Sequence, residues 1–439
     1  MPLVVYGASV RWAAQSLSRA GWTVMGMDVF GDRDTRRACA QWQPLPAKDI
    51  AATAETWAAD LGGRCLVVGG IDSTECTRWT QWCRVAADAR SLGIRVPDTY
   101  RIVDERLQFW ADEIDDGVPN RRSHQRGNAP LVSRRWLSKS LGGTGGLHVR
   151  RIDESVTVDT QSGVVKGGFE GESRFEKRSE SFFEPRESRA ADQGDGLIQA
   201  EIHGTPLGLI ALASPEHVRL VGVCRSMVGG MRRCNDSVRR PFAYAGSIGP
   251  CAMDRDVGDP LRRLALRTAR RCQLSGLFNI DLVQDFEGGL WFLEVNSRPS
   301  ASCEVLERSL QRQGILRRSE SLLDWHLDAQ APGGQGPAGS VVNPMKPNVD
   351  DPNWLIAKRI VYSGHAGVWD VSDLPWTRSR QDGDWTIRVG DIGRQGLLIS
   401  RGDPIATLLM EAPRNLANRH QSFPSTLRRW IRRVQSSVA

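Results

Sequence analysis

The stretch from residue 277 to residue 303 reads LFNIDLVQDFEGGLWFLEVNSRPSASC, and it holds two apolar runs on either side of Glu287-Gly288. Apolar runs that flank such a turn pair are typical of an antiparallel hairpin. If the turn centres on that pair, residues whose numbers sum to 575 face each other, so Asp281 lies opposite Glu294. Asn296 follows Glu294 by two residues and therefore projects from the same face of its strand.

The two carboxylates belong to strands that are otherwise apolar, where an unpaired charge is costly. In isolation, an Asp and a Glu on a hairpin more often point to solvent or pair with an Arg. The run Glu-Val-Asn-Ser-Arg-Pro at 294–299 favours a different interpretation. Two carboxylates and an amide oxygen on one face supply the hard oxygen ligands that Mg²⁺ takes. The sequence therefore predicts a metal site made of Asp281, Glu294 and Asn296.

A lysine precedes a glycine-rich loop earlier in the chain. A predicted strand at 135–139 ends in Lys139, and the loop that follows contains Gly142, Gly143, Thr144, Gly145 and Gly146. A lysine in this position can place its ammonium on a phosphate while loop N–H groups bind the other oxygens. The loop is neither a P-loop nor GxGxxG, and glycine-rich turns are common. Only six of the 58 basic residues are lysines, which favours a functional role for Lys139.

Length and composition describe a folded protein of several domains. At roughly 150 residues per domain, 439 residues predict about three domains. With 40% hydrophobic and 25% charged residues, extensive disorder and a fibrous repeat are excluded. No apolar run approaches the roughly 18 residues that cross a bilayer, and the N-terminus shows no secretory signal. We therefore expect a soluble, cytoplasmic protein that does not associate with a membrane.

Net charge, cysteine content and missing motifs disfavour several classes of partner and enzyme. The net charge of +7 comes from 52 arginines and six lysines against 51 acidic residues. Arginine enrichment can follow from genomic base composition, and it can also favour anionic partners. We take genomic base composition as the main cause and therefore expect no nucleic-acid partner. The nine cysteines form no CxxC pair and no Cys/His cluster with zinc spacing, so we expect reduced thiols. GxSxG and HExxH are also absent, which removes the usual support for a hydrolase or a zinc enzyme.

Residues 1–100 predict a Rossmann-like domain with a parallel α/β sheet. Apolar runs predict strands at 2–6, 22–28 and 65–70, with a helix after the first of them. Ser9 is in position to cap that helix. The turn after the first strand lacks GxGxxG, so a dinucleotide site has little support.

The sequence pattern changes at about residue 101, which predicts a second domain over 101–330, followed by a small β-rich domain. The second domain is expected to begin with a helix through Leu107, Trp110 and Ile114, and its polar stretch 151–195 to form a flexible insert. A linker at 331–353 leads to a β-rich domain at 354–439. Its last segment, 425–434, predicts a basic amphipathic helix whose apolar stripe docks on that domain; contact with nucleic acid or lipid headgroups is the less favoured alternative.

Three segments in this order resemble the ATP-grasp superfamily. They are Lys139 with its glycine loop, the segment IQAEIHG at 198–204, and the hairpin. The second segment alone is typical of an ordinary core strand. The resemblance covers roughly residues 1–310 and points to the carboxylate–amine ligase and carboligase-like branch. Looser matches follow at 242–250, 356–362 and 402–407.

The resemblance implies a role for each matching residue. Asp281, Glu294 and Asn296 would bind Mg²⁺, with Mn²⁺ as an alternative, and ATP would be the other cofactor. Arg298 and Lys139 would be catalytic: Arg298 would steady the acyl phosphate, and Lys139 would contact the ATP phosphates. The remaining ATP-binding residues implied are Arg106, Gly142, Gly143, Thr144, Gly145, Gly146, Gln199, Ala200, Glu201 and Ile202.

The sequence departs from the family pattern at several positions. Arg106 stands where the family has its first phosphate lysine. The acidic residues of the adenine segment are replaced by Ala200 and His203, and Glu201 is displaced by one position, which puts ribose recognition in doubt. Asn279 occupies a position that is Arg in some amino-acid ligases of the family.

The function implied is an ATP-dependent, ADP-forming ligase. It would activate a substrate carboxylate as an acyl phosphate for attack by an amine, and similar proteins are associated with one-carbon cofactor biosynthesis of the methanofuran and tetrahydromethanopterin type. Two alternatives stay open: a bicarbonate-dependent carboligase, and a degenerate ATP-binding regulatory module. A Rossmann oxidoreductase is a distant third. The expected partners are small carboxylate and amine substrates, and the sequence is compatible with a homodimer.

Overall fold

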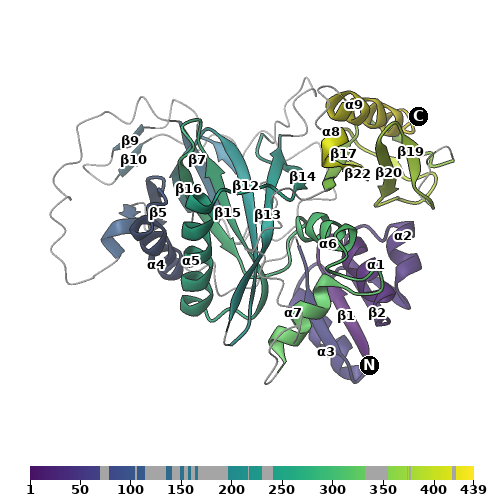
Figure 1. Ribbon diagram of the computed structural model, residues 1–439, viewed down its shortest axis with the longest axis horizontal. Coiled ribbons are helices and arrows are strands. Elements are labelled where there is room, and N and C mark those ends of the chain that lie inside the picture. The colour runs from purple at the N-terminus through teal and green to yellow at the C-terminus, as the bar shows by residue number, and fades with distance from the viewer. Residues whose placement is uncertain are drawn as a thin grey trace.

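The N-terminal part of the molecule is a four-stranded parallel sheet with strand order β3-β2-β1-β4 (Figure 1). The computed structural model describes residues 1–69, 79–103, 106–113, 135–140, 149–152, 157–159, 164–166, 196–215, 217–229, 241–331, 354–372, 374, 377–417 and 422–439. The strands of this sheet are β1 (Pro2–Tyr6), β2 (Thr23–Asp28), β3 (Gln41–Pro44) and β4 (Arg64–Val67). The helices beside it are α1 (Arg11–Arg19), α2 (Arg33–Ala38) and α3 (Ile50–Asp60). The predicted parallel α/β sheet is confirmed.

The start of α1 differs from the prediction. Val10, not Ser9, is the N-cap residue, and no side chain caps it in the expected way. The backbone N–H of Val10 instead donates to Asp28 Oδ2 at 3.1 Å. The Ser9 hydroxyl donates to Asp391 Oδ1 at 3.2 Å, so it is used in a contact between distant parts of the chain. The prediction of Ser9 as a helix cap is wrong because an acidic residue at the end of β2 lies closer to the helix start.

A second sheet carries the predicted lysine strand. Its order is β8-β7-β11-β5-β6-β10-β9. The strands are β5 (Thr99–Val103), β6 (Arg106–Phe109), β7 (Trp136–Ser140), β8 (Arg150–Arg151), β9 (Thr157–Asp159), β10 (Val164–Lys166) and β11 (Gly196–Ala200). Helix α4 (Trp79–Ser91) lies beside this part of the chain.

The helix predicted through Leu107 and Trp110 is wrong. Leu107 belongs to β6 and pairs with Ile102 of β5, and only Trp110–Glu113 form one short 3₁₀ turn. The reason is tertiary packing, since Trp110 is buried against Trp82 of α4, with their ring centroids 6.2 Å apart. Three predicted features lie wholly or largely outside the described residues: Ile114, the insert at 151–195 and the linker at 331–353.

The largest sheet has nine strands in the order β16-β15-β12-β13-β14-β17-β22-β20-β19. Its strands are β12 (Thr205–Ala213), β13 (Val218–Val228), β14 (Tyr244–Gly249), β15 (Gly276–Gln284), β16 (Leu290–Asn296), β17 (Trp354–Tyr362), β19 (Arg380–Asp382), β20 (Trp385–Gly390) and β22 (Pro404–Pro413). Strand β14 pairs with β17, with Ser247 opposite Lys358, so one sheet continues from the middle of the chain into the C-terminal strands. The small pair β18 (Gly367–Val368) and β21 (Leu398–Ile399) lies apart from it. The domain boundaries themselves stay predictions.

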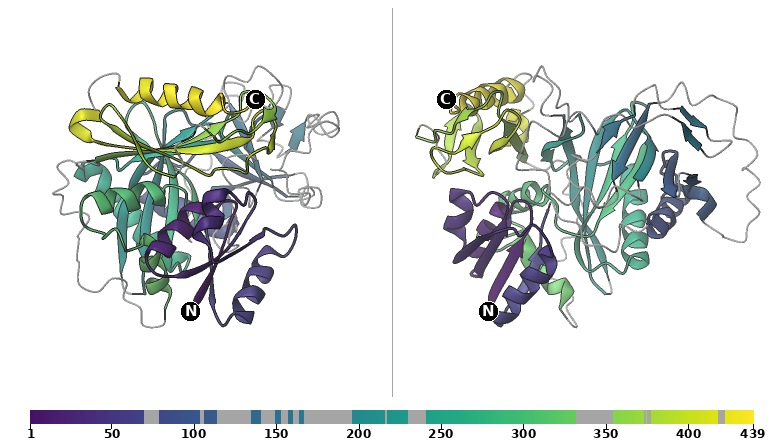
Figure 2. Two further views of the ribbon diagram at one scale, coloured as in Figure 1. Left: turned by 90° about the vertical axis from the view of Figure 1, so that its right-hand side faces the viewer. Right: turned by 180° about the vertical axis from the view of Figure 1, so that it is seen from behind.

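The two faces of the nine-stranded sheet pack against different helices. One face packs on α5 (Arg255–Arg271), with Leu209 and Ala211 of β12 in the same core as Leu264. The other face packs on α6 (Cys303–Arg312) and α7 (Leu322–Gln330), and through them on the N-terminal sheet; Ile210 and Leu306 share that core. Figure 2 shows the C-terminal strands above the N-terminal sheet, with the central strands to one side of both. The predicted architecture is confirmed: a parallel sheet first, a mixed α/β middle and a β-rich end.

The last helix, α9 (Ser422–Gln435), docks as predicted. Trp430 and Val434 are buried in the C-terminal core, and Leu427 and Ile431 pack against it. Helix α8 (Arg414–Ala417) precedes it. Among the described residues, no helix combines the length and the apolar character needed to span a membrane. The cysteines in those residues are free.

Candidate active site

The hairpin formed by β15 and β16 places two carboxylates opposite each other. Asp281 pairs with Glu294, the register that the sequence predicts. A bulge at Leu293 shifts the remaining pairs, so Leu282 lies opposite Phe292. The Leu293 carbonyl accepts a hydrogen bond from Trp82 Nε1 at 2.7 Å. The sequence does not reveal this bulge, but the bulge leaves the pair of carboxylates in register.

Asp281 is half-buried beside neutral donors and a second negative charge. Its Oδ1 accepts from Asn279 Nδ2 at 2.7 Å, and its Oδ2 accepts from Asn296 Nδ2 at 2.9 Å. Burial and then the charge of Glu294 raise the pKa of Asp281 to about 7. Lys139 Nζ lies 3.9 Å from Glu294 Oε2. Even with this ammonium nearby, the pKa of Asp281 stays raised.

The surroundings of this pair fit a small hard cation. Asn279 Oδ1 is buried, and no hydrogen-bond partner reaches it from the described residues. Gly208 leaves room in front of it, because a Cβ there would lie 3.0 Å from Asn279 Oδ1 and 3.9 Å from Asp281 Oδ1. Two carboxylates and two asparagine amides form a donor set of the kind that binds Mg²⁺. A cation there would also relieve the repulsion between the carboxylates.

Arg298 follows the hairpin and lies next to the carboxylates. Its side chain is buried, and its Nη2 lies 3.5 Å from Asn296 Oδ1 as a donor. Four residues later, Ser302 Oγ shares a hydrogen bond of 2.8 Å with Ser247 Oγ of β14. The segment between Arg298 and Ser302 therefore crosses the polar face of the sheet from β16 towards β14.

The lysine strand and the predicted adenine segment are neighbours. Lys139 of β7 pairs with Leu197 of β11, and Gln199 lies on the same face of this sheet as Lys139. Gln199 is buried and donates to Thr99 Oγ1 at 3.1 Å. Ala200 points to the opposite face, where it packs with Tyr100.

Glu201 does not replace the missing acidic residues of the family pattern. Its carboxylate pairs with Arg151, with Nη2 2.6 Å from Oε1. Its backbone N–H bonds to the carbonyl of Arg135, and the N–H of Ala200 bonds to the carbonyl of Asp98. Ile202 follows as a half-buried residue beyond the strand. These backbone donors are already used within the protein, so any adenine contact would involve other groups.

Two parts of the predicted site lie wholly or partly outside the described residues. The glycine loop, Gly142 to Gly146, lies outside the described residues. The backbone of Arg106 lies in β6, opposite Val103 and Val164, and its side chain lies outside the described part of the structure.

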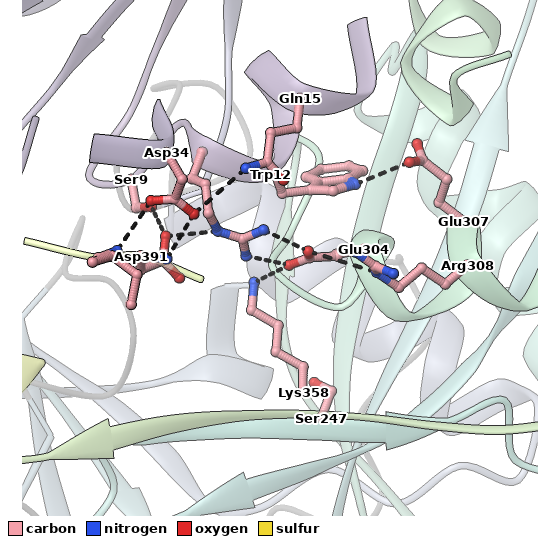
Figure 3. A network of polar contacts seen from close by, with 12 residues as sticks. Ser9, Trp12, Gln15, Asp34, Ser247, Glu304, Glu307, Arg308, Lys358 and Asp391 are labelled. Carbon is pink, nitrogen blue, oxygen red and sulfur yellow. Dashed lines mark hydrogen bonds and ion pairs between the residues drawn. The ribbon is translucent and has the colours of Figure 1, made fainter. Parts of the chain in front are cut away.

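Sequence reasoning missed a buried ionic cluster where the N-terminal sheet, α6 and the C-terminal strands meet (Figure 3). Arg11 donates to both carboxylate oxygens of Glu304, at 2.8 and 2.7 Å. Lys358 Nζ lies 2.9 Å from Glu304 Oε2, and Arg308 bonds to Glu411 at 2.7 Å. The scarcity of lysine was the available signal, because Lys358 is one of only six lysines in the chain.

Burial alone would raise the pKa of Glu304. The charges of Arg11 and Lys358 outweigh that effect and hold the pKa well below its usual value. The residues of this cluster come from three distant stretches of the chain, so the cluster joins the parts of the molecule that surround the hairpin.

Comparison with known proteins gives a consistent result. Residues 153–302 match the family model of the ATP-grasp domain. No curated protein sequence matches the chain.

Solved structures match the fold of nearly the whole chain. An L-amino acid ligase from Bacillus licheniformis has a TM-score of 0.55 at 12% identity, covering 100% of this chain and 98% of its own. An N5-carboxyaminoimidazole synthetase from Staphylococcus aureus, complexed with ADP, has a TM-score of 0.55 at 10% identity, covering 98% and 96%. The biotin carboxylase domain of the Hydrogenobacter thermophilus 2-oxoglutarate carboxylase, in complex with MgADP, ADP and bicarbonate, has a TM-score of 0.55 at 14% identity, covering 94% and 86%.

The match to the family model, the three-part fold and the motif of the hairpin agree with one another. Residues 153–302 are therefore identified as an ATP-grasp domain, in a chain whose fold is similar to those of the solved structures above.

Proposed function

We propose that the protein is an ATP-dependent ligase that joins a carboxylate to an amine and releases ADP and phosphate. The observation that carries the proposal is the facing pair Asp281–Glu294, two half-buried carboxylates flanked by asparagine amides, with the pKa of Asp281 raised. Such a pair is suited to hold Mg²⁺ together with the phosphates of ATP. The three-part fold shared with an amino-acid ligase supports the same class of reaction.

The reaction would proceed in two balanced steps. An oxygen of the substrate carboxylate attacks the γ-phosphorus of ATP, the bond to the β–γ bridging oxygen breaks, and ADP leaves with that electron pair. The amine nitrogen then attacks the acyl carbon, phosphate leaves, and the nitrogen loses a proton to give the amide. Mg²⁺, when bound, supplies Lewis-acid stabilisation of charge on the phosphate oxygens.

The protein's own residues have distinct tasks in this scheme. Asp281, Glu294 and Asn296 hold the metal, and Lys139 binds the ATP phosphates from the neighbouring sheet. Arg298, buried beside Asn296, stabilises the negative charge that develops on the acyl group. Further nucleotide contacts are assigned to Arg106, Gln199, Ala200, Glu201, Ile202 and the glycine loop Gly142, Gly143, Thr144, Gly145 and Gly146.

Isotope transfer would test this reaction class. With a carboxylate labelled with ¹⁸O, one labelled oxygen should appear in the released phosphate, and hydroxylamine should trap the activated acyl group as a hydroxamate. Carboxylates and amines of one-carbon cofactor biosynthesis, of the methanofuran and tetrahydromethanopterin type, are the first candidates to screen. ADP release that depends on bicarbonate and not on an amine would instead indicate a carboligase. Bound ATP that stays intact with every substrate would indicate a binding module.

A further inference from the structure

The segment from Arg298 to Ser302 joins the proposed metal site to the start of α6. At one end, Arg298 is buried and its Nη2 lies 3.5 Å from Asn296 Oδ1. At the other end, Ser302 is the N-cap residue of α6, and its carbonyl accepts from the backbone N–H of Leu306 at 3.2 Å. Pro299 lies between them and restricts the backbone, because its ring fixes one dihedral angle. A shift at Ser302 is therefore passed on to Arg298 through few flexible bonds.

The Ser302 side chain does not cap its helix. A serine at the N-cap usually accepts a hydrogen bond from a backbone N–H in the first turn, yet no such bond is made in α6. The hydroxyl instead shares a hydrogen bond of 2.8 Å with Ser247 Oγ of β14. Both serines are buried, Ser302 at 5% exposure and Ser247 at 0%. This hydroxyl thus fixes the start of α6 to the sheet rather than to its own helix.

Ser247 is itself held in place by its neighbours. Its backbone lies opposite Ser226 of β13 and Lys358 of β17, and Figure 3 shows it next to Lys358. Its Oγ shares a second hydrogen bond of 2.8 Å with the Tyr244 hydroxyl. The Tyr244 carbonyl in turn accepts from the Tyr362 hydroxyl at 2.7 Å. Ser247 therefore offers Ser302 a partner that is fixed within the nine-stranded sheet.

An ion pair also holds this end of the helix. Glu304, two residues after Ser302, lies 2.9 Å from Lys358 Nζ and is paired with Arg11. These contacts fix α6 against the C-terminal strands and the N-terminal sheet. The bond between Ser302 and Ser247 lies closer in the chain to Arg298, at the point where the segment enters the helix. It is therefore the contact best placed to set the path of the segment.

We propose that Ser247, acting through Ser302, is a positioning residue for Arg298. A group that stabilises charge developing in a reaction must already be in its place, and a displacement of about 1 Å can lower the rate about a hundredfold. The inference rests on the proposed ligase function, in which Arg298 stabilises negative charge on the acyl group. Ser247 need not touch a substrate for this task, because it fixes the backbone that carries Arg298.

Inorganic phosphate is the probe for this role. The proposed reaction releases ADP and phosphate whichever carboxylate and amine are joined, and a guanidinium binds phosphate strongly. Phosphate affinity is measured by calorimetry on the full-length protein saturated with Mg·ADP. Arg298→Gln should weaken phosphate binding about tenfold or more. Ser247→Ala and Ser302→Ala should each weaken it about fivefold, while their affinity for Mg·ADP stays that of the wild type.

Ser309→Ala is the matched control. Ser309 is a buried serine of the same helix, 1% exposed, and its Oγ accepts from Gln313 Nε2 at 2.9 Å. The variant should lower the thermal unfolding midpoint about as much as Ser247→Ala, since each removes one buried hydroxyl. Its phosphate affinity should equal that of the wild type. This comparison separates positioning from a general loosening of the fold.

Double-mutant cycles test the connection from Ser247 to Arg298. In an Arg298→Gln background, Ser247→Ala should cause no further loss of phosphate affinity, because the side chain that it positions is gone. The double variant Ser247→Ala, Ser302→Ala should bind phosphate as each single variant does, because both substitutions remove the same hydrogen bond.

Three results would overturn the proposal. The first is a Ser247→Ala variant that binds phosphate as tightly as the wild type. The second is a Ser309→Ala variant that loses as much phosphate affinity as Ser247→Ala, which would mean a general effect of loosening α6. The third is an additive loss for Ser247→Ala and Arg298→Gln, which would mean that the two residues act independently.

The same titrations separate this inference from the proposed function. If Arg298→Gln weakens phosphate binding and Ser247→Ala does not, only the positioning role is contradicted. If the wild type binds no Mg·ADP, or if Arg298→Gln binds phosphate like the wild type, the ligase proposal is contradicted and the positioning role with it. Once substrates are found, Ser247→Ala should lower kcat about fivefold with the KM for ATP unchanged.

Discussion

Glu304 is a fully buried carboxylate and Asp281 a half-buried one over the same face of the nine-stranded sheet, and their surroundings differ. Glu304 lies within 2.9 Å of Arg11 and Lys358, and its pKa is held low. Within the described residues, Asp281 accepts from two amide donors and faces Glu294, and its pKa is raised to about 7. A neutralised carboxylate joins parts of the fold, whereas one left without its counter-charge is a candidate for binding a ligand.

The largest effect is expected at the neutralised site. Glu304→Gln leaves Arg11 and Lys358 buried side by side without their counter-charge, so it should lower the free energy of unfolding by about 3–5 kcal/mol. Urea denaturation of the variant and the wild type measures this difference. Lys358→Met is the matched control: it keeps the two-pronged Arg11–Glu304 pair and should cost clearly less. A loss below about 1 kcal/mol for Glu304→Gln is typical of an exposed ion pair and would contradict a structural role of this cluster.

The proposed metal site should respond in the opposite direction. The raised pKa of Asp281 means that the folded protein binds more protons than the unfolded chain below about pH 7, so the wild type loses stability as the pH rises towards that value. Asp281→Asn removes this loss and should stabilise the protein without ligand by about 2 kcal/mol at pH 8. Urea denaturation at pH 5 and pH 8 tests the sign. A destabilised variant at pH 8 would show that the carboxylate has a structural partner.

His326 provides a third kind of buried titratable group, one that is kept neutral. Its Nδ1 accepts from the backbone N–H of Leu277 at 2.7 Å, and burial lowers its pKa to about 3. The unfolded chain therefore takes up a proton first on acidification. Stability should fall by about 1 kcal/mol between pH 7 and pH 5.5 from this residue. His326→Gln should lack that share of the pH dependence, and identical pH profiles would contradict the assignment.

The smallest effect on stability is expected at Lys139. Its ammonium lies 3.9 Å from a Glu294 side chain that is 39% exposed, a contact of the kind that contributes little to folding. Lys139→Met should change the free energy of unfolding by no more than about 0.5 kcal/mol while weakening ATP binding about tenfold or more. A loss of stability as large as that of Glu304→Gln would contradict the claim that Lys139, unlike Glu304, contributes little to folding.

The sequence predicted those parts of the site whose geometry depends on residues close together in the chain. Alternation within 277–303 sets the register of the hairpin, and so Asp281 opposite Glu294 could be predicted before the fold was known. The bulge at Leu293 could not, since it depends on Trp82, more than two hundred residues away in the chain.

Tertiary contacts also explain the other misses. A helix was predicted through Leu107 and Trp110, yet pairing with β5 and packing against α4 decide that segment. Ser9 and Arg11 lie next to a predicted strand, but their partners Asp391 and Glu304 are hundreds of residues away. No local pattern indicates which of the acidic residues in the sequence will be neutralised and which will not.

The binding of Mg·ATP tests the central claim most directly. Calorimetry on the wild type should show binding that requires both Mg²⁺ and ATP, and Glu294→Gln should weaken it by about a hundredfold, or roughly 2.7 kcal/mol. Glu287→Gln, at the exposed tip of the same hairpin, should bind like the wild type. A folded wild type that binds no Mg·ATP, or a Glu294→Gln variant that binds as well as the wild type, would contradict the account.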